Sequence, residues 1–220
     1  MNIITFYGSQ EKQVVGKILC LGKNYAAHAM EMKSDIPTKP LIFIKPSSSI
    51  IHNGENIIIP QISKDVHHEV ELVVVIGRGG KMIPAMSAYQ YVSGYAVGLD
   101  MTLRDIQSEA KKNGSPWAVA KGFDTSAPIS DVIPKSEIKN PHELTITCRV
   151  NGIVRQNSST KHMIFQIDKI IEYLSSIFTL EQGDLIFTGT PEGVGQVKVG
   201  DVIEAELEGY IKTSYPVIEA

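Results

Sequence analysis

The sequence predicts a mixed, β-rich fold of the α+β class with a few helices at its periphery. Short segments rich in β-branched residues and bounded by turn residues dominate the chain, and such segments are typical of strands. The few helical segments do not alternate regularly with the strands, which argues against a doubly wound parallel sheet. The length of 220 residues favours one domain, and we expect a short N-terminal segment over residues 1–16 followed by a single domain over residues 17–220.

The strand candidates follow one another along most of the chain. They are residues 17–22, 40–45, 56–60, 70–77, 91–102, 183–189 and 200–209. Glycines inside the segment 91–102 indicate places where another backbone comes close. Residues 144–156 predict a hairpin, because Asn151 and Gly152 form a dipeptide favoured in two-residue turns.

Three segments have helical character. Residues 24–33 are long enough for two or three turns, and residues 102–114 contain good helix formers followed by a glycine stop. The third helix is predicted over residues 163–178. Its expected packing face consists of apolar residues at helical spacing, namely Ile164, Ile167, Ile170, Ile171, Leu174 and Phe178.

Composition and charge exclude several classes of function. The net charge of −3 gives no support for a nucleic-acid or acidic-membrane partner, and no apolar run approaches the length of a membrane span. The first residues lack the layout of a signal peptide and the arginines of a mitochondrial presequence. Cys20 and Cys148 cannot form a disulfide framework, so we expect two reduced thiols in a cytoplasmic protein.

Two acidic residues lie at the start of the most apolar strand candidate, in the stretch "HHEVELVVVIG" over residues 67–77. In a strand, Glu69 and Glu71 share a face with Cα atoms about 7 Å apart, and they repel each other at the edge of a buried segment. Asp100 ends the next strand candidate, so three carboxylates could converge there. An all-oxygen set of ligands suits a hard cation, Mg²⁺ or Mn²⁺.

Two other interpretations of these residues remain open. Acidic residues at strand ends often face solvent, and a single Glu-x-Glu pair is weak evidence for a metal. His67 and Glu69 also match the first half of an iron site with two histidines and one carboxylate, for which His142 or His162 would supply the second histidine. Neighbouring His68 is expected to be a hydrogen-bonded core residue or a residue that supports a ligand.

The stretch "GKNYAAHAMEM" places His28 and Glu31 three residues apart, on one face of a helical turn. A carboxylate beside an imidazole fixes its tautomer and favours its use as a general base for water. The polar, proline-rich residues that follow are suited to a mobile lid. An ordinary exposed pair on a helix is the alternative interpretation.

Lys121 lies in a small, apolar context in the stretch "WAVAKGFDTSAP". A buried lysine requires an anion, a carboxylate partner or a lowered pKa for Schiff-base chemistry, unless its head group reaches water. Residues 187–195, "FTGTPEGVG", are glycine-rich but match neither nucleotide-binding glycine motif. Backbone N–H groups and the Thr190 hydroxyl could still contact an anion there.

In this order the motifs resemble the fumarylacetoacetate hydrolase family, and most closely its small single-domain branch of the acylpyruvase and oxaloacetate decarboxylase type. The matching stretches are "GKNYAAHAMEM", "PLIFIKPSSS", "HHEVELVVVIG", "GYAVGLDMTLRDIQ", "PWAVAKGFDTSAPIS" and "GDLIFTGTPEGVG". The resemblance extends from about residue 17 nearly to the end of the chain, so it implies that the domain over residues 17–220 is catalytic.

The resemblance implies a β-roll fold, a homodimer and a divalent ion held by Glu69, Glu71 and Asp100. It implies that His28 and Glu31 activate water from a lid. Lys121 becomes a cation beside the metal. Residues at positions that contact the substrate in relatives are Arg104, Gln107, Thr190 and Lys23. The last is a departure, because the family often has arginine where this chain has Lys23, and a lysine cannot bind a carboxylate with two parallel hydrogen bonds.

The implied reaction is metal-dependent cleavage of a carbon–carbon bond in a small 2,4-dioxo acid, with a 2-oxo acid as the class of substrate. Acylpyruvate hydrolysis to pyruvate and a carboxylic acid, or decarboxylation of oxaloacetate, would pass through a pyruvate enolate. Alternatives within the family are oxaloacetate keto–enol tautomerisation and dioate isomerisation with decarboxylation. Alternatives from other classes are a Schiff-base lyase centred on Lys121 and a non-catalytic metal- or ligand-binding β-module.

Overall fold

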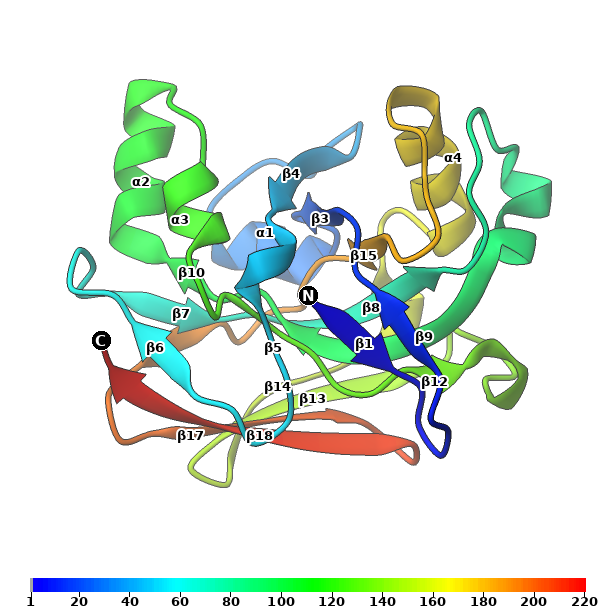
Figure 1. Ribbon diagram of the computed structural model, residues 1–220. Coiled ribbons are helices and arrows are strands. Elements are labelled where there is room, and N and C mark those ends of the chain that lie inside the picture. Colours follow the sequence, from blue (N-terminus) through cyan, green and yellow to red (C-terminus); the bar gives the residue numbers. More distant parts are fainter. Residues whose placement is uncertain (1) are drawn as a thin grey trace.

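Strands make up most of the fold, and the helices lie around them (Figure 1). The computed structural model describes residues 2–220. The strands are β1 (Ile3–Thr5), β2 (Lys12–Val14), β3 (Ile18–Gly22), β4 (Leu41–Lys45), β5 (Ile50–Ile51), β6 (Ile57–Ile59), β7 (Val66–His68), β8 (Val70–Ile76), β9 (Val92–Leu99), β10 (Thr102–Leu103), β11 (Ala127–Pro128), β12 (Ile133–Pro134), β13 (Thr145–Val150), β14 (Ile153–Ser159), β15 (Leu185–Phe187), β16 (Gly195–Val197), β17 (Val202–Leu207) and β18 (Ile211–Glu219). The helices are α1 (Ala26–Glu31), α2 (Arg104–Asn113), α3 (Ala118–Gly122) and α4 (Ile167–Ile177), and the short 3-10 helices are η1 (Ser47–Ser49), η2 (Ala85–Tyr91), η3 (Lys135–Glu137) and η4 (Thr160–His162).

Two mixed sheets form the framework. One has six strands in the order β12-β9-β8-β15-β3-β4, with β15 and β3 parallel, and the other has five strands in the order β14-β13-β17-β18-β6, with β18 and β6 parallel. In Figure 1 the five-stranded sheet lies at the bottom, and α2, α3 and α4 lie at the top. The structure therefore confirms the predicted β-rich α+β class with peripheral helices.

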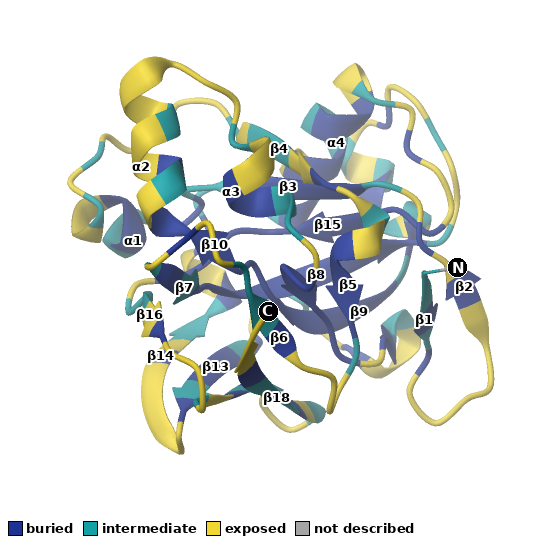
Figure 2. Cartoon of the chain, turned by 60° about the vertical axis from the view of Figure 1, so that its left-hand side comes forward, coloured by how far each residue is buried: buried dark blue, intermediate teal, exposed yellow. Residues whose placement is uncertain are grey.

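Strand β8 is buried along its whole length, as its composition predicted. Leu72 and Val74 belong to a large core that also contains residues of the five-stranded sheet, such as Ile203. Val73 belongs to a smaller core on the opposite face of the six-stranded sheet. Because alternate residues of a strand point to opposite faces, one continuous apolar run fills two cores. Figure 2 shows the buried interior of the sheets beneath the more exposed surfaces of α2 and α3.

The N-terminal residues form a two-stranded hairpin of β1 and β2. Ile4 and Phe6 are buried in the smaller core, and Phe6 forms a bridge with Val132. Burial of such side chains stabilises a fold by about 1.5–3 kcal/mol each. Residues 2–16 are therefore packed against the rest of the chain and contribute to its core.

Helix α2 ends as predicted, because Gly114 adopts the left-handed conformation with φ of 66°. Helix α4 is shorter than the predicted helix over residues 163–178. Asn24 accepts the Ile164 N–H with its backbone carbonyl and the Phe165 N–H with its side chain, at 2.8 Å and 2.7 Å. These bonds hold the segment out of helical geometry, so the predicted start was wrong. Ile164 and Phe178 are accordingly only partly buried, unlike the four central residues of the expected packing face.

Glu69 separates β7 from β8, and these strands belong to different sheets. Strand β7 pairs with β10 and β16, whereas β8 pairs with β9 and β15. The predicted strand over residues 70–77 therefore corresponds to β8, and the chain passes from one sheet to another just before it, at Glu69. The reason is a side chain, because the Val70 N–H donates to Gln156 Oε1 at 3.0 Å instead of to a neighbouring strand.

Strand β18 was not predicted, although Thr213, Tyr215 and Val217 alternate toward the core. Pro216 lies between them and argues against a strand that has partners on both sides. Among residues 2–220, no helix has the length and hydrophobicity needed to span a bilayer.

Candidate active site

The structure brings the three predicted carboxylates together. Glu69 lies at the break between β7 and β8, Glu71 lies in β8, and Asp100 directly follows β9. Because β8 and β9 are antiparallel with Val70 opposite Leu99, the start of one strand meets the end of the other. One oxygen atom from each carboxylate lies within 4.8 Å of the other two, and all three residues are buried.

Three buried cations surround the carboxylates. Lys121 Nζ lies 2.9 Å from Glu69 Oε2 and 2.5 Å from Asp100 Oδ2, and the Arg104 guanidinium donates to Glu69 Oε1. Lys45 Nζ lies 2.8 Å from Asp100 Oδ1, at an angle that allows an ion pair without a hydrogen bond. The three carboxylates and the three cations make the cluster formally neutral, which limits the cost of burying so many charges.

The carboxylates differ in their pKa. Burial raises the pKa of Glu71 well above its ordinary value, and the charges of Asp100 and Glu69 raise it further, although the Gly189 N–H donates to Glu71 at 2.7 Å. Burial also raises the pKa of Glu69, but Lys121 and Arg104 outweigh burial and hold it well below its usual range. Among the described residues Glu71 has no ion-pair partner, so this side of the cluster can accept a further cation.

All three ammonium hydrogens of Lys121 have acceptors, since Nζ also donates to the Thr102 hydroxyl at 2.7 Å. Burial lowers the pKa of Lys121, but Asp100 and Glu69 more than offset this and leave the pKa above its ordinary value. A Schiff base requires a neutral amine. The carboxylate-partner interpretation of Lys121 therefore fits the structure, and the Schiff-base alternative does not.

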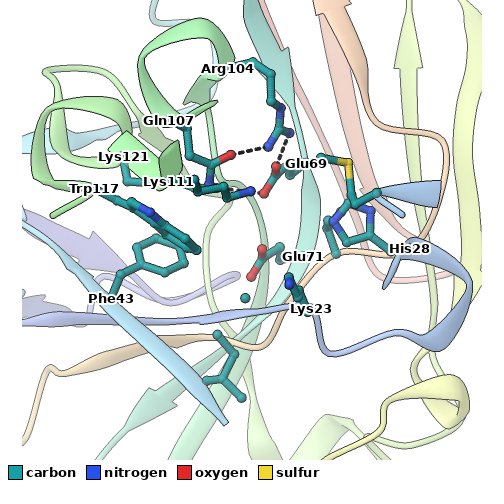
Figure 3. A pocket seen from close by; sticks show the side chains of 14 residues that line it. Lys23, His28, Phe43, Glu69, Glu71, Arg104, Gln107, Lys111, Trp117 and Lys121 are labelled. Carbon is teal, nitrogen blue, oxygen red and sulfur yellow. Dashed lines mark hydrogen bonds and ion pairs between the residues drawn. The ribbon is translucent and has the colours of Figure 1, made fainter. Parts of the chain in front are cut away.

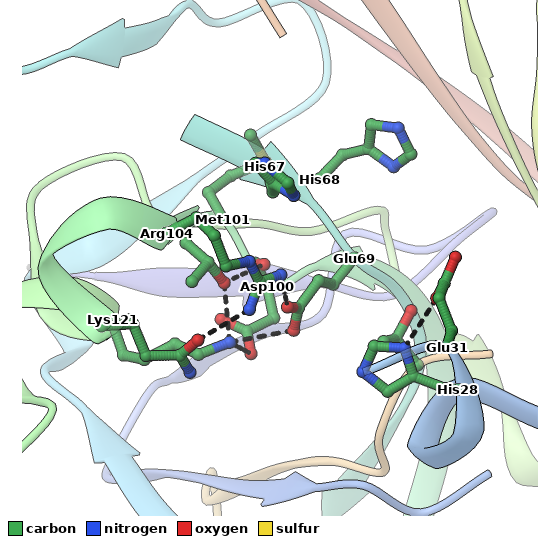
Figure 4. Close-up of polar contacts among 12 residues, drawn as sticks. His28, Glu31, His67, His68, Glu69, Asp100, Met101, Arg104 and Lys121 are labelled. Carbon is green, nitrogen blue, oxygen red and sulfur yellow. Dashed lines mark hydrogen bonds and ion pairs between the residues drawn. The ribbon is translucent and has the colours of Figure 1, made fainter. Parts of the chain in front are cut away.

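His28 and Glu31 lie on α1 and contact each other, with 3.1 Å between His28 Nδ1 and Glu31 Oε2. His28 is buried, so the pair is not an ordinary exposed one. The other oxygen of Glu31 accepts the Gly193 N–H at 3.0 Å. In Figure 4 this dyad lies on one side of Glu69, and Lys121 lies on the other.

A cavity lies between the dyad and the cations (Figure 3). Its lining includes the predicted residues Lys23, His28, Glu69, Glu71, Arg104, Gln107, Lys121 and Thr190, together with Phe43, Lys111 and Trp117. Its volume is about 30 Å³. Sites for small organic ligands usually hold several hundred Å³, so a substrate requires the walls to move.

The predicted substrate-binding residues lie on different walls of the cavity. Arg104 opens α2 and donates to Gln107 Oε1 one turn later, at 2.7 Å. Lys23 lies in a left-handed turn with φ of 60° before α1.

Lys111, which also lines the cavity, was not predicted. Its Nζ atom lies 5.2 Å from the centre of the Trp117 ring. Burial lowers the pKa of Lys111, and the positive charges of Arg104 and Lys23 lower it further.

Thr190 follows β15 in the glycine-rich loop. Its hydroxyl donates to the Val70 carbonyl at 2.8 Å and accepts from Gln156 Nε2 at 2.8 Å. The hydroxyl hydrogen is therefore already used within the protein. Thr190 lines the cavity, but it has only one lone pair left for a ligand.

The histidines proposed for an iron site lie apart. His67 Nε2 contacts Asp65 at 2.9 Å, and His142 Nε2 contacts the Tyr89 hydroxyl at 2.5 Å, while His162 is exposed. Within residues 2–220, the one cluster of potential ligands found contains no histidine. The iron-site alternative was therefore wrong.

Sequence reasoning missed Lys45 and the Gly189 N–H. Lys45 ends an apolar strand candidate, where a lysine is usually solvated, so the sequence gives no signal of its burial. The Gly189 contact depends on the backbone of the loop after β15, where φ is 96°. A glycine in a glycine-rich loop likewise gives no signal in sequence.

Comparison with known proteins places these features in a family. The model of the fumarylacetoacetate hydrolase C-terminal domain matches residues 17–217. The mitochondrial oxaloacetate tautomerase of Rattus norvegicus is 48% identical over 91% of this chain and 90% of its own length. An uncharacterised protein from Pyrococcus abyssi is 53% identical over 88% of this chain and 86% of its own length.

Solved structures agree with this relationship. A fumarylpyruvate hydrolase from Pseudomonas aeruginosa, crystallised with Mn²⁺ and pyruvate, superposes with a TM-score of 0.94 at 39% identity, covering 99% of this chain and 96% of that one. A 5-carboxymethyl-2-hydroxymuconate delta-isomerase from Mycobacterium smegmatis superposes with a TM-score of 0.84 at 40% identity, covering 94% and 80%. A match over nearly the whole length, in both sequence and structure, establishes that the chain belongs to the fumarylacetoacetate hydrolase family.

Proposed function

We propose that the protein is a divalent-metal-dependent enzyme that cleaves a carbon–carbon bond in a small 2,4-dioxo acid and releases pyruvate from an acylpyruvate. The observation that carries this proposal is a cavity lined by Glu69 and Glu71 of the carboxylate cluster, by the buried cations Arg104 and Lys121, and by His28 of the His28–Glu31 dyad. The related hydrolase that was crystallised with Mn²⁺ and pyruvate supports the same class of reaction.

Glu69, Glu71 and Asp100 would hold the metal. The donor set is entirely oxygen, which suits Mg²⁺ or Mn²⁺, and Glu71 lacks an ion-pair partner among the described residues. The bound ion would supply a Lewis acid that polarises the 2-keto group of the substrate. Mg²⁺ and Mn²⁺ are both compatible with these ligands.

The charges around the cavity suit an anionic substrate. The cluster is formally neutral by itself, so a divalent ion would give it a charge of +2, which attracts a carboxylate group. Lys23 and Lys111 add positive charge along the cavity wall. Gln107 and Arg104 offer hydrogen-bond donors that would fix the orientation of the substrate.

The His28–Glu31 dyad would activate water. If Glu31 accepts the hydrogen on His28 Nδ1, then Nε2 is the nitrogen left to take a proton from water. Hydroxide would attack the distal acyl carbonyl, the carbon–carbon bond would break, and the acyl group would leave as a carboxylic acid. The pyruvate enolate left behind would take up the proton removed from water to give pyruvate. Lys121 balances the charge of the enolate, although it must release one of its three acceptors before it can donate to the enolate oxygen.

Helix α1 would act as a lid. The cavity of about 30 Å³ is too small for a substrate, and α1 carries the dyad that covers it. Opening the lid would break the exposed hydrogen bond from the Gly193 N–H to Glu31, and it would also expose His28 and Ala29, which are buried when α1 is closed.

Keto–enol tautomerisation or decarboxylation of oxaloacetate is the second candidate, and the relatives named oxaloacetate tautomerase favour it. Both reactions need an enolate to be stabilised but need no water nucleophile. The same cations and metal would serve them, while the dyad would matter less for decarboxylation than for hydrolysis.

The first experiment measures pyruvate release from acetylpyruvate by purified protein, with Mg²⁺ or Mn²⁺ and then with excess EDTA. We expect turnover that is lost on chelation and restored by metal. Turnover that is indifferent to EDTA would contradict the metal assignment. Absence of turnover, combined with metal-dependent conversion of oxaloacetate or its enol, would replace the hydrolase proposal with the second candidate.

Assembly and location belong to the same proposal. We expect a homodimer, because a groove along the edge strand β4 exposes apolar side chains such as Leu41 and Ile44. We expect a reducing compartment, the cytoplasm, because Cys20 and Cys148 are free thiols. Some relatives are named as mitochondrial proteins, so fractionation of cells is the measurement that decides the location.

A further inference from the structure

Strand β14 has an unusual pattern of burial. Of its seven described residues, Gln156 alone is fully buried, and its side chain is polar. The pairing of β14 with β13 shifts by one residue next to it, so that Cys148 lies opposite Gln156 and Arg149 opposite Val154. Such a bulge turns a side chain away from the direction it would otherwise take, and bulges are common beside active sites.

The amide of Gln156 has a partner in every direction. Its Oε1 accepts the Val70 N–H and contacts His68 Nδ1, both at 3.0 Å, and its Nε2 donates to Thr190 Oγ1 at 2.8 Å and to the Pro191 carbonyl at 2.9 Å. The Val70 N–H can only donate and the Pro191 carbonyl can only accept, so these two groups fix the orientation of the amide. His68 must then donate from Nδ1.

These contacts join two segments that carry parts of the candidate site. Val70 lies between Glu69 and Glu71, so the bond to its N–H fixes the backbone of two carboxylates. Thr190 and Pro191 belong to the loop that follows β15. In the same loop the Gly189 N–H donates to Glu71.

The loop is also fixed at its far end on β14. Gly193 has φ of 94°, and a Cβ atom there would lie 2.1 Å from the Arg155 carbonyl oxygen, next to Gln156. The Gly193 N–H donates to Glu31 of the dyad. The loop over residues 189–193 therefore donates one N–H to Glu71, a predicted metal ligand, and another to Glu31 of the His28–Glu31 dyad.

We propose that Gln156 is a positioning residue, which aligns the carboxylates with the His28–Glu31 dyad by holding the loop over residues 189–193 against the start of β8. The inference rests on the proposed function, because it treats Glu69 and Glu71 as metal ligands. Residues that support metal ligands typically change metal affinity by about 10- to 100-fold when replaced.

The test compares Gln156→Leu with Gln13→Leu. Gln13 is a matched control, because it is also a buried glutamine whose Nε2 donates to β8, here to the Ile76 carbonyl at the opposite end of the strand, 3.2 Å away. Mn²⁺ affinity is measured by titration calorimetry, and amide exchange of residues 189–193 is measured by mass spectrometry.

We expect Gln156→Leu to weaken Mn²⁺ binding by about 10-fold or more and to speed exchange in the loop, since the replaced amide fixes the backbone between Glu69 and Glu71 and holds the loop at Thr190 and Pro191. Gln13→Leu should leave both quantities as in the original protein. Unchanged Mn²⁺ affinity and loop exchange in Gln156→Leu would overturn the inference. If the original protein binds no Mn²⁺, the proposed function fails instead.

Should Gln156→Leu not fold, Gln156→Glu serves in its place. It keeps the side-chain length and the acceptor for Val70, and it loses the donors to Thr190 and Pro191. Faster exchange confined to residues 189–193 supports the positioning role. Exchange equal to that of the original protein contradicts it.

Discussion

Replacing Lys45 by methionine tests the charge balance of the candidate site. Lys45 is fully buried, and its ammonium group lies 2.8 Å from Asp100 and 3.2 Å from the Met101 carbonyl, with a further short contact to the Lys121 carbonyl. Methionine has a similar length but no charge. The substitution therefore leaves Asp100 with Lys121 alone and removes the Lys45 donor from two buried carbonyl groups. The Lys121 carbonyl still accepts the Ser126 hydroxyl at 2.9 Å, whereas the Met101 carbonyl loses the donor described for it.

The expected loss of stability follows from these contacts. Removing one partner of a buried ion pair typically costs about 3–5 kcal/mol of unfolding free energy. With a urea m-value of about 3 kcal/mol/M for a larger domain, the unfolding midpoint should fall by about 1–2 M. Urea unfolding is followed by circular dichroism, first without metal and then with Mn²⁺ in excess.

Mn²⁺ should stabilise Lys45→Met more than the original protein. An ion bound to Asp100 replaces part of the charge lost with Lys45, and it is no longer repelled by the Lys45 ammonium group. Lys169→Met is the control, since Lys169 is exposed and forms only a surface pair with Glu172, so its midpoint should barely move. A midpoint shift below about 0.3 M, or equal stabilisation of both proteins by Mn²⁺, would refute the reasoning.

Three further predictions concern other parts of the molecule. His28→Ala should reduce acylpyruvate hydrolysis by about 10²- to 10⁴-fold and oxaloacetate decarboxylation by less, and equal losses in paired rate measurements would contradict a water-activating role. Burial raises the pKa of Cys148 to about 12 and that of Cys20 well above its ordinary value. Since only thiolates react with Ellman's reagent, and both thiols are protonated below their raised pKa, the folded protein should show almost no reaction at pH 8, whereas urea should expose two thiols. Gly193→Ala should lower the thermal midpoint and the rate of hydrolysis, because its Cβ would collide with the Arg155 carbonyl; an unchanged rate would show that the loop tolerates displacement.

The sequence predicted those features that depend on local patterns. Alternating or continuous apolar runs identified β3, β8 and β9, and Asn151 with Gly152 identified the hairpin turn. The carboxylates were predicted because acidic residues beside a buried strand are conspicuous, and the dyad was predicted because His28 and Glu31 lie three residues apart on a helical turn. The convergence of the three carboxylates is a consequence of antiparallel pairing between β8 and β9, which were adjacent strand candidates.

The features that the sequence did not predict depend on contacts between distant segments. Asn24 delays the start of α4 from more than 140 residues away in the chain, and Gln156 ends one strand and begins another at Glu69 from 86 residues away. No periodicity within a short window contains such information. Lys45 was missed for a related reason, since a lysine at the end of a strand is usually solvated, and only the fold shows that Asp100 lies beside it.

The formal neutrality of the six buried charges bears on how the protein handles its ion in the cell. A zinc finger unfolds when its metal is removed, because the metal ligands have no other partners in the protein. Here Lys45, Lys121 and Arg104 already satisfy two of the three carboxylates. We therefore expect an apoprotein that survives dialysis against a chelator and takes up whichever hard cation the cell supplies. Reconstitution with single metals would then compare Mg²⁺ and Mn²⁺ on one preparation of the same folded chain.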